Sequence, residues 1–359
     1  MKERITGFDF ARALAIFGMV IVNFKIAMGA NSGSAVLLYV TGLLEGRASA
    51  LFVVLAGVGL TFLTSKARLL GDSKLIQKSR WLIVKRGILL VLLGLAYTPI
   101  WEADILHFYG FYFMVGAAVF TCRDKRLLQF GVLMMLLFPV LALFFNYEKG
   151  WNWETLAYID FWTVNGMIRH IFFNGFHPVV PWSAFLILGM WLGRQDLRDK
   201  AIRSKLLQIF AVIWIATEGI FGFLKFLLSN LLDIGLTPED ITFLFSTSII
   251  PPLPQYILAA GSLACVVILL SLSLTERFSK TTWVGWVYKT GQMSLTLYVA
   301  HVIIGMGVLE AMGMLENQSI GISVFSSLVF CLVAVLFSVL WLSRFRSGPL
   351  EWGFRKLVS

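Results

Sequence analysis

A carboxylate and a histidine stand three residues apart in the stretch WEADILHFYG, where they could act together on a proton. In a helix this spacing places Asp104 and His107 on one face. A carboxylate that hydrogen-bonds an imidazole fixes its tautomer and raises its basicity, as a general base requires. The structural alternative is an interfacial histidine that packs beside Trp101, Tyr109 and Tyr112.

A second histidine stands at the head of an apolar segment, NGFHPVVPWSAFLILGMWLGR. Pro178 and Pro181 restrict the backbone before them, so a helix is expected to begin here with free backbone N–H groups. Such groups bind an anion or a carbonyl oxygen. We therefore predict that His177 and Trp182 lie at the mouth of a ligand-binding or catalytic site.

Further charged or polar residues fall within apolar segments, where burial of a charge costs roughly 2.5–3.5 kcal/mol and requires a partner or a function. Asp9 and Arg12 form either an ion pair within the first segment or an anion site facing a cavity. Glu45 and Arg47 open the second segment, and Arg47 is expected to be held by an acid inside the bundle. His301 falls near the middle of the ninth segment, either as a ligand or as a neutral histidine paired with a Ser or Tyr.

The composition places these residues in a membrane protein. The chain has 359 residues, of which 58% are hydrophobic and only 14% charged, whereas about a quarter are charged in a typical soluble protein. The formal net charge of +10 arises from Lys and Arg gathered in short loops, which is typical of membrane orientation and argues against a nucleic-acid partner. The sequence contains no phosphate-binding loop, nucleophile elbow or metal-ligand cluster, so we expect no bound metal.

We therefore expect an all-α, polytopic membrane protein with about ten transmembrane helices in one bundle, forming a single domain over residues 1–359. A run needs about 20 apolar residues to cross the hydrocarbon core of the bilayer. The runs that approach this length cover residues 8–28, 42–64, 82–100, 105–122, 127–146, 178–194, 206–229, 253–275, 290–311 and 320–342.

The loops between these runs predict the orientation of the chain. Most basic residues lie on the side of the two termini, including those between Lys66 and Arg86 and those of the tail SRFRSGPLEWGFRK. Acidic residues dominate the opposite loops. Because cytoplasmic loops carry an excess of Lys and Arg, both termini are predicted to lie in the cytoplasm.

Two long connections fall on the predicted outer side. Residues 147–177 alternate aromatic and polar residues at helical spacing, which favours an amphipathic helix at the membrane surface. His170 lies in this connection and is expected to be exposed. Residues 230–252 contain a helix start, TPED, and a stop, PPLP, which favour a second, partly ordered outer segment.

Several segments resemble the YeiB-like bacterial membrane proteins. RITGFDFARALAIFGMVIVNF resembles the opening block of that family. Four further segments resemble later blocks of the same family, in the same order: LFVVLAGVGLTFL, KRGILLVLLGL with DILHFYGFYFM, GQMSLTLYVAHVII and GPLEWGFRKL. The resemblance covers nearly the whole chain. This family is similar to heparan-α-glucosaminide N-acetyltransferase and, more remotely, to membrane acyltransferases of the O-antigen acetylase type.

The resemblance implies a transmembrane-acyltransferase fold in a bacterial inner membrane, embedded in the lipid bilayer and assembled as a homodimer. A cytosolic acyl-CoA, acetyl-CoA in the first instance, would pass its acyl group to a sugar or other small-molecule acceptor on the outer side. The matching blocks contain Asp9, Arg12, Asn23, Asp104, His107 and His301. The chain departs at one position from heparan-α-glucosaminide N-acetyltransferase, in which the catalytic histidine lies in the loop after the first helix. The corresponding loop here, KIAMGANSGSA, contains no histidine.

These residues are compatible with two functions. In an acyltransferase, the basic residues at the inner mouth, Arg12, Lys85 or Arg86, would attract the phosphates of CoA. An outer histidine would deprotonate the acceptor, and Arg47 or the start of the sixth helix would stabilise the developing oxyanion. The alternative is a transporter or exporter of a small metabolite, in which intramembrane His and Arg residues bind substrate or relay protons.

Overall fold

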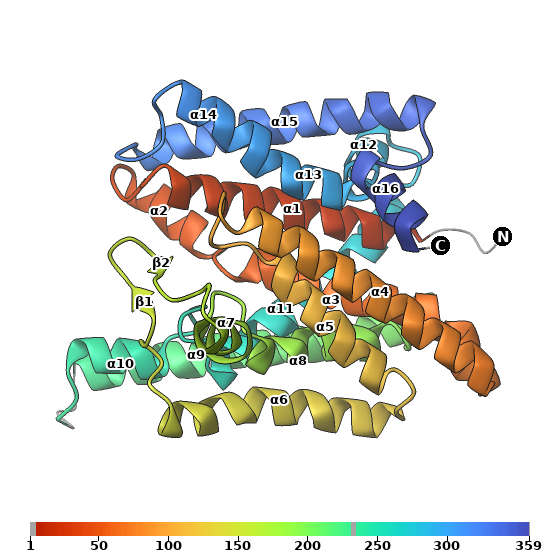
Figure 1. Ribbon diagram of the computed structural model, residues 1–359, viewed down its shortest axis with the longest axis horizontal. Coiled ribbons are helices and arrows are strands. Elements are labelled where there is room, and N and C mark those ends of the chain that lie inside the picture. Colours follow the sequence, from red (N-terminus) through yellow and green to blue (C-terminus); the bar gives the residue numbers. More distant parts are fainter. Residues whose placement is uncertain (1–4, 231–234, 359) are drawn as a thin grey trace. The chain divides into compact units, whose positions relative to one another are not determined.

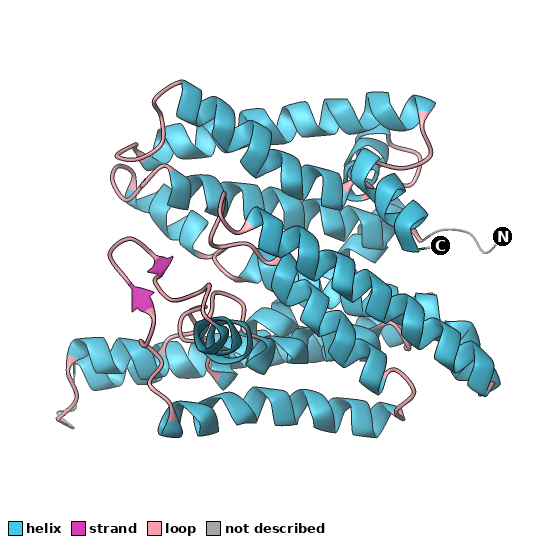
Figure 2. Ribbon diagram, viewed as in Figure 1, coloured by secondary structure: helices cyan, strands magenta, loops and turns pink. Residues whose placement is uncertain are grey.

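The computed structural model describes residues 5–230 and 235–358, and most of this part of the chain is helical (Figure 2). Two strands of two residues each, β1 (Trp151–Asn152) and β2 (Ala157–Tyr158), pair antiparallel in a short hairpin. The predicted all-α class is therefore confirmed for the described residues.

Seven described helices or helical runs are long and apolar enough to cross a membrane. They are α1 (Thr6–Ala27), the run Ala35–Leu70 with α2 (Ala35–Gly42) and α3 (Arg47–Leu70), α6 (Asp124–Phe144), α9 (Lys200–Asn230), α11 (Pro254–Arg277), the run Ser294–Ala311 and α15 (Ile320–Arg344). An eighth crossing is counted when the pair Val164–Asn174 and Val179–Leu192, bent by 47°, is taken as one span. The chain is a multi-pass membrane protein.

The count of about ten spans is not confirmed by helix length and composition. Two predicted spans, 82–100 and 105–122, fall on α4 (Ser73–Tyr97) and α5 (Leu106–Val119). Lys and Arg residues occupy the first half of α4, and α5 has only 14 residues. Neither helix therefore belongs to the long, apolar set, although each of the ten predicted segments overlaps a helix.

The chain divides into two compact units, and the single domain expected over residues 1–359 stays a prediction. The first unit consists of Met1–Phe52 and Val266–Ser359. In it α1 packs against α12, α13 and α15 (Figure 1). Its remaining elements are α2, α12 (Thr282–Gly291), α13 (Ser294–Ala300), the π-helix η2 (His301–Met306), α14 (Gly307–Ala311) and α16 (Pro349–Val358).

The contact between α1 and α12 depends on a glycine. A Cβ atom at Gly291 would lie 1.7 Å from the carbonyl oxygen of Asp9. Only a residue without a side chain allows the two helices to approach this closely, as is common between helices in membranes.

The second unit consists of Val53–Cys265. The helices α4 and α5 lie side by side in it, and α8 packs against both α5 and α6 (Figure 1). It also contains α7 (Val164–Arg169), the π-helix η1 (His170–Asn174), α8 (Val179–Leu192), α9 and α10 (Pro238–Phe245). Glycines again permit the closest approaches, since a Cβ at Gly110 would lie 2.4 Å from the carbonyl oxygen of Gly87.

Residues 147–177 do not form the single amphipathic helix that their periodicity favours. They form the β1–β2 hairpin, the short α7 and the π-helix η1. Gly150 has a φ of 92°, and the side chain of Thr163 caps α7 by accepting a hydrogen bond from the Gly166 amide at 3.0 Å. A turn residue and a cap at these places end any continuous helix.

The second outer connection is only partly described, because residues 231–234 of the predicted segment 230–252 lie outside the described residues. The TPED helix start is confirmed. Thr237 and Asp240 form a capping box at the start of α10, in which each side chain accepts a hydrogen bond from the backbone N–H of the other residue.

Candidate functional site

Three histidines converge in the second unit, and we call His107, His170 and His177 the histidine cluster. The rings of His107 and His170 stack with centroids 5.8 Å apart. Phe108 lies beside all three, with its ring centroid 4.0 Å from that of His107, 5.2 Å from that of His170 and 5.8 Å from that of His177. All three histidines are buried. Among the described residues, no group of three or more His, Cys, Asp or Glu is arranged to hold a metal ion.

The predicted Asp104–His107 pair is formed at the start of α5. Oδ2 of Asp104 lies 3.1 Å from Nδ1 of His107, and both side chains are fully buried. The same oxygen accepts hydrogen bonds from the backbone N–H groups of Leu106 at 2.9 Å and His107 at 3.2 Å, which holds the carboxylate in place.

The pair leaves one imidazole nitrogen available. An ionised carboxylate only accepts hydrogen bonds, so the proton of a neutral His107 ring lies on Nδ1 and the lone pair on Nε2. Within the described part of the chain, the buried Nε2 of His107 has no hydrogen-bond partner. This is the arrangement of an imidazole that can accept a proton.

A glycine in α4 makes room for the pair. A Cβ atom at Gly94 would lie 2.2 Å from the backbone nitrogen of His107 and 2.8 Å from Oδ2 of Asp104. The packing of α4 against α5 therefore sets the position of both members of the pair.

His177 occupies the turn before α8, as the two prolines that follow it suggested. Its ring packs edge-on against the ring of Trp182, with centroids 4.6 Å apart, and its carbonyl oxygen accepts a hydrogen bond of 2.5 Å from the hydroxyl of Tyr112. Its buried Nδ1 has no partner among the described residues. No carboxylate of the described part of the chain hydrogen-bonds this imidazole, in contrast to His107.

The start of α8 differs in one respect from the predicted row of free amides. Val180 has non-helical backbone angles, φ −104° and ψ 116°, and the Trp182 amide donates a hydrogen bond of 3.1 Å to the Pro178 carbonyl. The helix begins at the prolines as predicted, but the amide of Trp182 is already satisfied. We therefore assign no anion site to this end of α8.

The prediction that His170 is exposed is wrong. Its side chain is buried because η1 folds under the β1–β2 hairpin, where the rings of Tyr158 and Phe161 pack edge-on at 4.5 and 4.9 Å. Gly175 permits this fold, since a Cβ there would lie 2.4 Å from the carbonyl oxygen of His170. The aromatic residues of the segment and the Asn-Gly pair after η1 are the sequence signals for a packed turn.

A pocket of about 260 Å³ opens beside His170. Its wall includes the aromatic rings of Tyr158, Phe161 and Phe176 and the carboxylate of Glu102. The described residues that line it include no Lys or Arg. His107 is not part of the wall, but its ring stacks on that of His170, which is.

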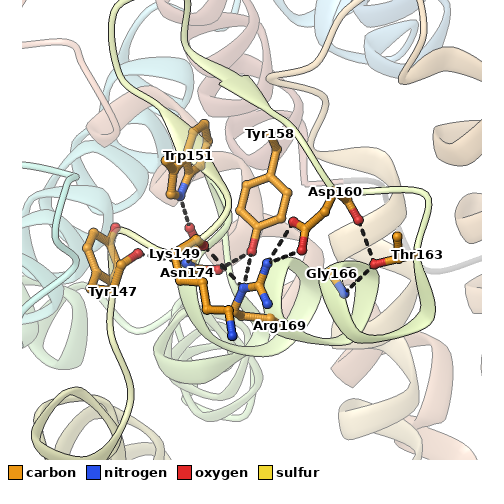
Figure 3. A network of polar contacts seen from close by, with 9 residues as sticks. All are labelled: Tyr147, Lys149, Trp151, Tyr158, Asp160, Thr163, Gly166, Arg169 and Asn174. Carbon is orange, nitrogen blue, oxygen red and sulfur yellow. Dashed lines mark hydrogen bonds and ion pairs between the residues drawn. The ribbon is translucent and has the colours of Figure 1, made fainter.

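A polar network holds this side of the pocket (Figure 3). Nη2 of Arg169 lies 2.7 Å from both carboxylate oxygens of Asp160, and its Nε donates to the hydroxyl of Tyr158 at 2.8 Å. That hydroxyl donates in turn to Oδ1 of Asn174 at 2.7 Å. Burial raises the pKa of Tyr158, so its hydroxyl stays protonated at neutral pH and remains a donor.

Asn174 connects this network to the preceding loop. Its side-chain Nδ2 donates to the backbone carbonyl oxygens of Tyr147 at 2.7 Å and Lys149 at 2.9 Å. Its backbone carbonyl accepts a hydrogen bond of 2.6 Å from the indole N–H of Trp151. The side chain is fully buried. These contacts join the hairpin to the π-helix that carries His170.

We predict that Asn174→Ala lowers the free energy of unfolding by about 1–3 kcal/mol, because two backbone carbonyls and the Tyr158 hydroxyl lose a buried partner. Thermal unfolding in detergent measures the change, and limited proteolysis should reveal faster cleavage within residues 147–163. Asn230→Ala is the matched control, since Asn230 is exposed and its side chain binds, among the described residues, the Phe226 carbonyl of its own helix. Equal unfolding and cleavage of the two variants would contradict the role of this network.

Five of the predicted polar residues of the first unit, Asp9, Arg12, Asn23, Glu45 and His301, belong to three separate pairs. Nδ2 of Asn23 lies 2.8 Å from Nε2 of His301, and Nδ1 of His301 binds the carbonyl of Tyr298. Because a carbonyl only accepts, the neutral ring carries its proton on Nδ1 and accepts from Asn23 at Nε2. A buried histidine and an amide, 278 residues apart in sequence, thus meet where α1 passes η2.

The other two pairs are ionic. Arg12 binds Asp9 at 2.5 Å, the intrahelical alternative for these residues, and Lys25 binds Glu45 at 2.6 Å. With a rise of 1.5 Å per residue, Asp9 and Asn23 are about 21 Å apart along α1, so the Asp9–Arg12 pair and the His301 pair are distinct sites. Two further predicted residues, Arg47 at the start of α3 and Arg86 in α4, are partly buried.

Comparison with known proteins adds to this geometry. Residues 4–219 match the family described as heparan-alpha-glucosaminide N-acetyltransferase, catalytic, and residues 197–359 match a family described as a protein of unknown function, DUF418. The chain is 26% identical to the "Uncharacterized protein YeiB" of Escherichia coli (strain K12), covering 99% of this chain and 96% of the relative. It is 22% identical to the "Uncharacterized protein YxaH" of Bacillus subtilis (strain 168), covering 99% and 94%.

Proposed function

The chain belongs to the YeiB-like family related to heparan-α-glucosaminide N-acetyltransferase, and from this premise we propose that it is an acyl-CoA-dependent membrane acyltransferase. The proposed donor is acetyl-CoA, which enters from the cytoplasm. The proposed acceptor is a sugar or another small molecule with a hydroxyl or amine group at the outer side of a bacterial inner membrane. The charge asymmetry of the loops supports this orientation.

One observation carries the proposal. The Asp104 carboxylate orients the imidazole of His107, whose buried Nε2 has no hydrogen-bond partner among the described residues. The ring of His107 stacks on that of His170, which lines the pocket. Acyl transfer to a hydroxyl or amine needs a group that accepts the acceptor's proton. The Asp104–His107 pair supplies that group, and His170 links it to the pocket. Nδ1 of His177 is likewise buried without a partner, but among the described residues no carboxylate hydrogen-bonds this ring.

The proton path that we propose uses two imidazoles. The acceptor lies in the pocket and gives its O–H or N–H proton to Nε2 of His170, and Nδ1 of His170 releases a proton toward Nε2 of His107. These two nitrogens do not hydrogen-bond to each other in the described structure, so a water molecule or a ring rotation must bridge them. Both of the inner nitrogens are buried without partners in the described structure. Asp104 stabilises the imidazolium that forms on His107.

The covalent step balances with this proton transfer. The acceptor oxygen or nitrogen forms a bond to the acyl carbon, and the carbon–sulfur bond of the thioester breaks. The CoA thiolate leaves and takes up the proton that the histidines removed from the acceptor. General-base catalysis of this kind contributes about 10²–10⁴ to the rate.

We propose that residues of the family blocks take part in binding the donor. Asn23 and His301 form a partly buried, uncharged pair, and Arg12 lies on the same helix toward the predicted cytoplasmic end. Binding of the phosphates of CoA by Arg12, Lys85 or Arg86 follows from charge. The family resemblance also favours a homodimer.

Isothermal titration of acetyl-CoA into the detergent-purified protein tests the donor. We expect saturable binding of acetyl-CoA and weaker binding of an acetyl thioester that lacks the nucleotide, because the phosphates contribute charge-assisted contacts. Absence of binding would contradict the proposal. Movement of a labelled metabolite across liposomes without any CoA would instead favour a transporter.

A further inference from the structure

The second unit contains a pair of arginines to which the proposed function above assigns no role. Arg68 lies near the end of α3, and Arg194 follows the end of α8. The helices that carry them meet one or two turns earlier, where the Thr61 hydroxyl donates a hydrogen bond of 2.7 Å to the Met190 carbonyl. The two guanidinium groups are close enough to interact electrostatically.

Arg194 closes the end of α5. Its Nη1 donates to the Cys122 carbonyl at 2.7 Å and to Oδ1 of Asp124 at 2.8 Å, and its Nη2 donates to the Phe120 carbonyl at 2.9 Å. A cation bound to the last carbonyls of a helix stabilises that helix end. The side chain of Arg194 is only 4% exposed, so this guanidinium is held in one orientation.

Both arginines nevertheless keep an unused donor. The Nε–H groups of Arg68 and Arg194 are buried, and no described residue accepts a hydrogen bond from either. A buried N–H of a charged group without an acceptor is costly, and so is the repulsion between two neighbouring cations. The one carboxylate that interacts with both, Asp124, is half exposed and already binds Nη1 of Arg194.

An oxyanion between the two groups relieves both costs. It would accept hydrogen bonds from the two Nε–H groups and neutralise the excess positive charge, to which the exposed Arg123, Lys125 and Arg126 also contribute. Arginine is the residue best suited to bind phosphate, because its planar group offers several donors to several oxygens. We propose that Arg68 and Arg194 form a binding site for a phosphate group.

The phosphate could belong to a nucleotide such as CoA or to the headgroup of an anionic lipid, since the recognising chemistry is the same. The site lies among loops predicted to be cytoplasmic, where both are present. The inference does not depend on acyl transfer, because binding is measured without turnover. Failure of the proposed reaction would therefore leave it intact.

The test compares Arg68→Gln with Arg126→Gln, which removes an exposed charge from the same region. Arg68 is chosen because no described backbone carbonyl depends on it, whereas Arg194 holds the end of α5. Inorganic phosphate, compared with nitrate at equal ionic strength, should raise the Tm of the wild type and of Arg126→Gln. Phosphate affinity should fall about tenfold or more in Arg68→Gln, as expected for a charge-assisted hydrogen bond.

Two further probes identify the source. Titration with adenosine 3′,5′-bisphosphate represents the nucleotide, and mixed micelles with phosphatidylglycerol, compared with phosphatidylcholine, represent the lipid. Dependence of either probe on Arg68, but not on Arg126, supports the site and names its ligand. Phosphate stabilisation that is equal in all three proteins, or absent from the wild type, would overturn the proposal.

Discussion

Replacement of His107 by glutamine is expected to lower the turnover number about a hundredfold or more, while the affinity for acetyl-CoA changes little. Glutamine fills similar space but cannot accept a proton at neutral pH. The backbone contacts of Asp104 with Leu106 and His107 remain, so the start of α5 is preserved. Initial rates of CoA release, combined with titration of acetyl-CoA, separate the loss of catalysis from a loss of binding.

His177→Gln is the matched comparison, because it makes the same change within the same histidine cluster. We expect a smaller loss, since His177 lacks the carboxylate that orients His107. Asp104→Asn keeps an oxygen for the two backbone amides but removes the charge, and it should lose activity in the same direction as His107→Gln. A large loss in His177→Gln with normal turnover in His107→Gln would assign the base to His177 instead.

Gly94→Ala is expected to have the second large effect, on both stability and activity. The added methyl group would lie 2.2 Å from the backbone nitrogen of His107 and 2.8 Å from Oδ2 of Asp104, so α4 and α5 must separate. Overpacking of this kind costs about 1–3 kcal/mol. The shift also moves the catalytic pair, so turnover should fall even in the protein that folds.

Gly219→Ala is the control for this prediction. Gly219 also lies inside a helix, α9, but no atom lies within 4 Å of the position that its Cβ would occupy. Alanine there should leave stability unchanged or raise it by up to about 1 kcal/mol. Thermal unfolding and CoA release measure both variants. Normal turnover and stability in Gly94→Ala would contradict the packing on which the pair depends.

Local patterns in the sequence predicted much of the candidate site. Asp104 and His107 are three residues apart, so the geometry of one helical turn was sufficient to expect their contact. The prolines around His177 likewise marked the start of α8. The apolar runs predicted where the helices lie, because a membrane span is recognised from composition within a single segment.

Contacts between distant segments could not be read in the same way. His170 was assigned to a surface helix because its periodicity fits one, whereas its burial depends on Tyr158, Phe161 and the hydrogen bonds of Asn174. The helix ends that carry Arg68 and Arg194 are brought together only because α3 packs on α8. Periodicity reports which residues share a face, and it does not report which other segment covers that face.

The contact between Asn23 and His301 is a third case. The two residues belong to matching family blocks, but the spacing within each block says nothing of a contact over 278 positions. The family resemblance selected both residues, and the packing of α1 beside η2 joined them. Resemblance and structure thus supply different parts of the same site.

Release of free CoA thiol from acetyl-CoA by the purified wild-type protein, with a mixture of small hydroxyl and amine acceptors, tests the central claim most directly. The account predicts that thiol release requires an acceptor and falls about a hundredfold in His107→Gln. Acetyl-CoA that binds but yields no acceptor-dependent thiol, or release that is unchanged in His107→Gln, would contradict it.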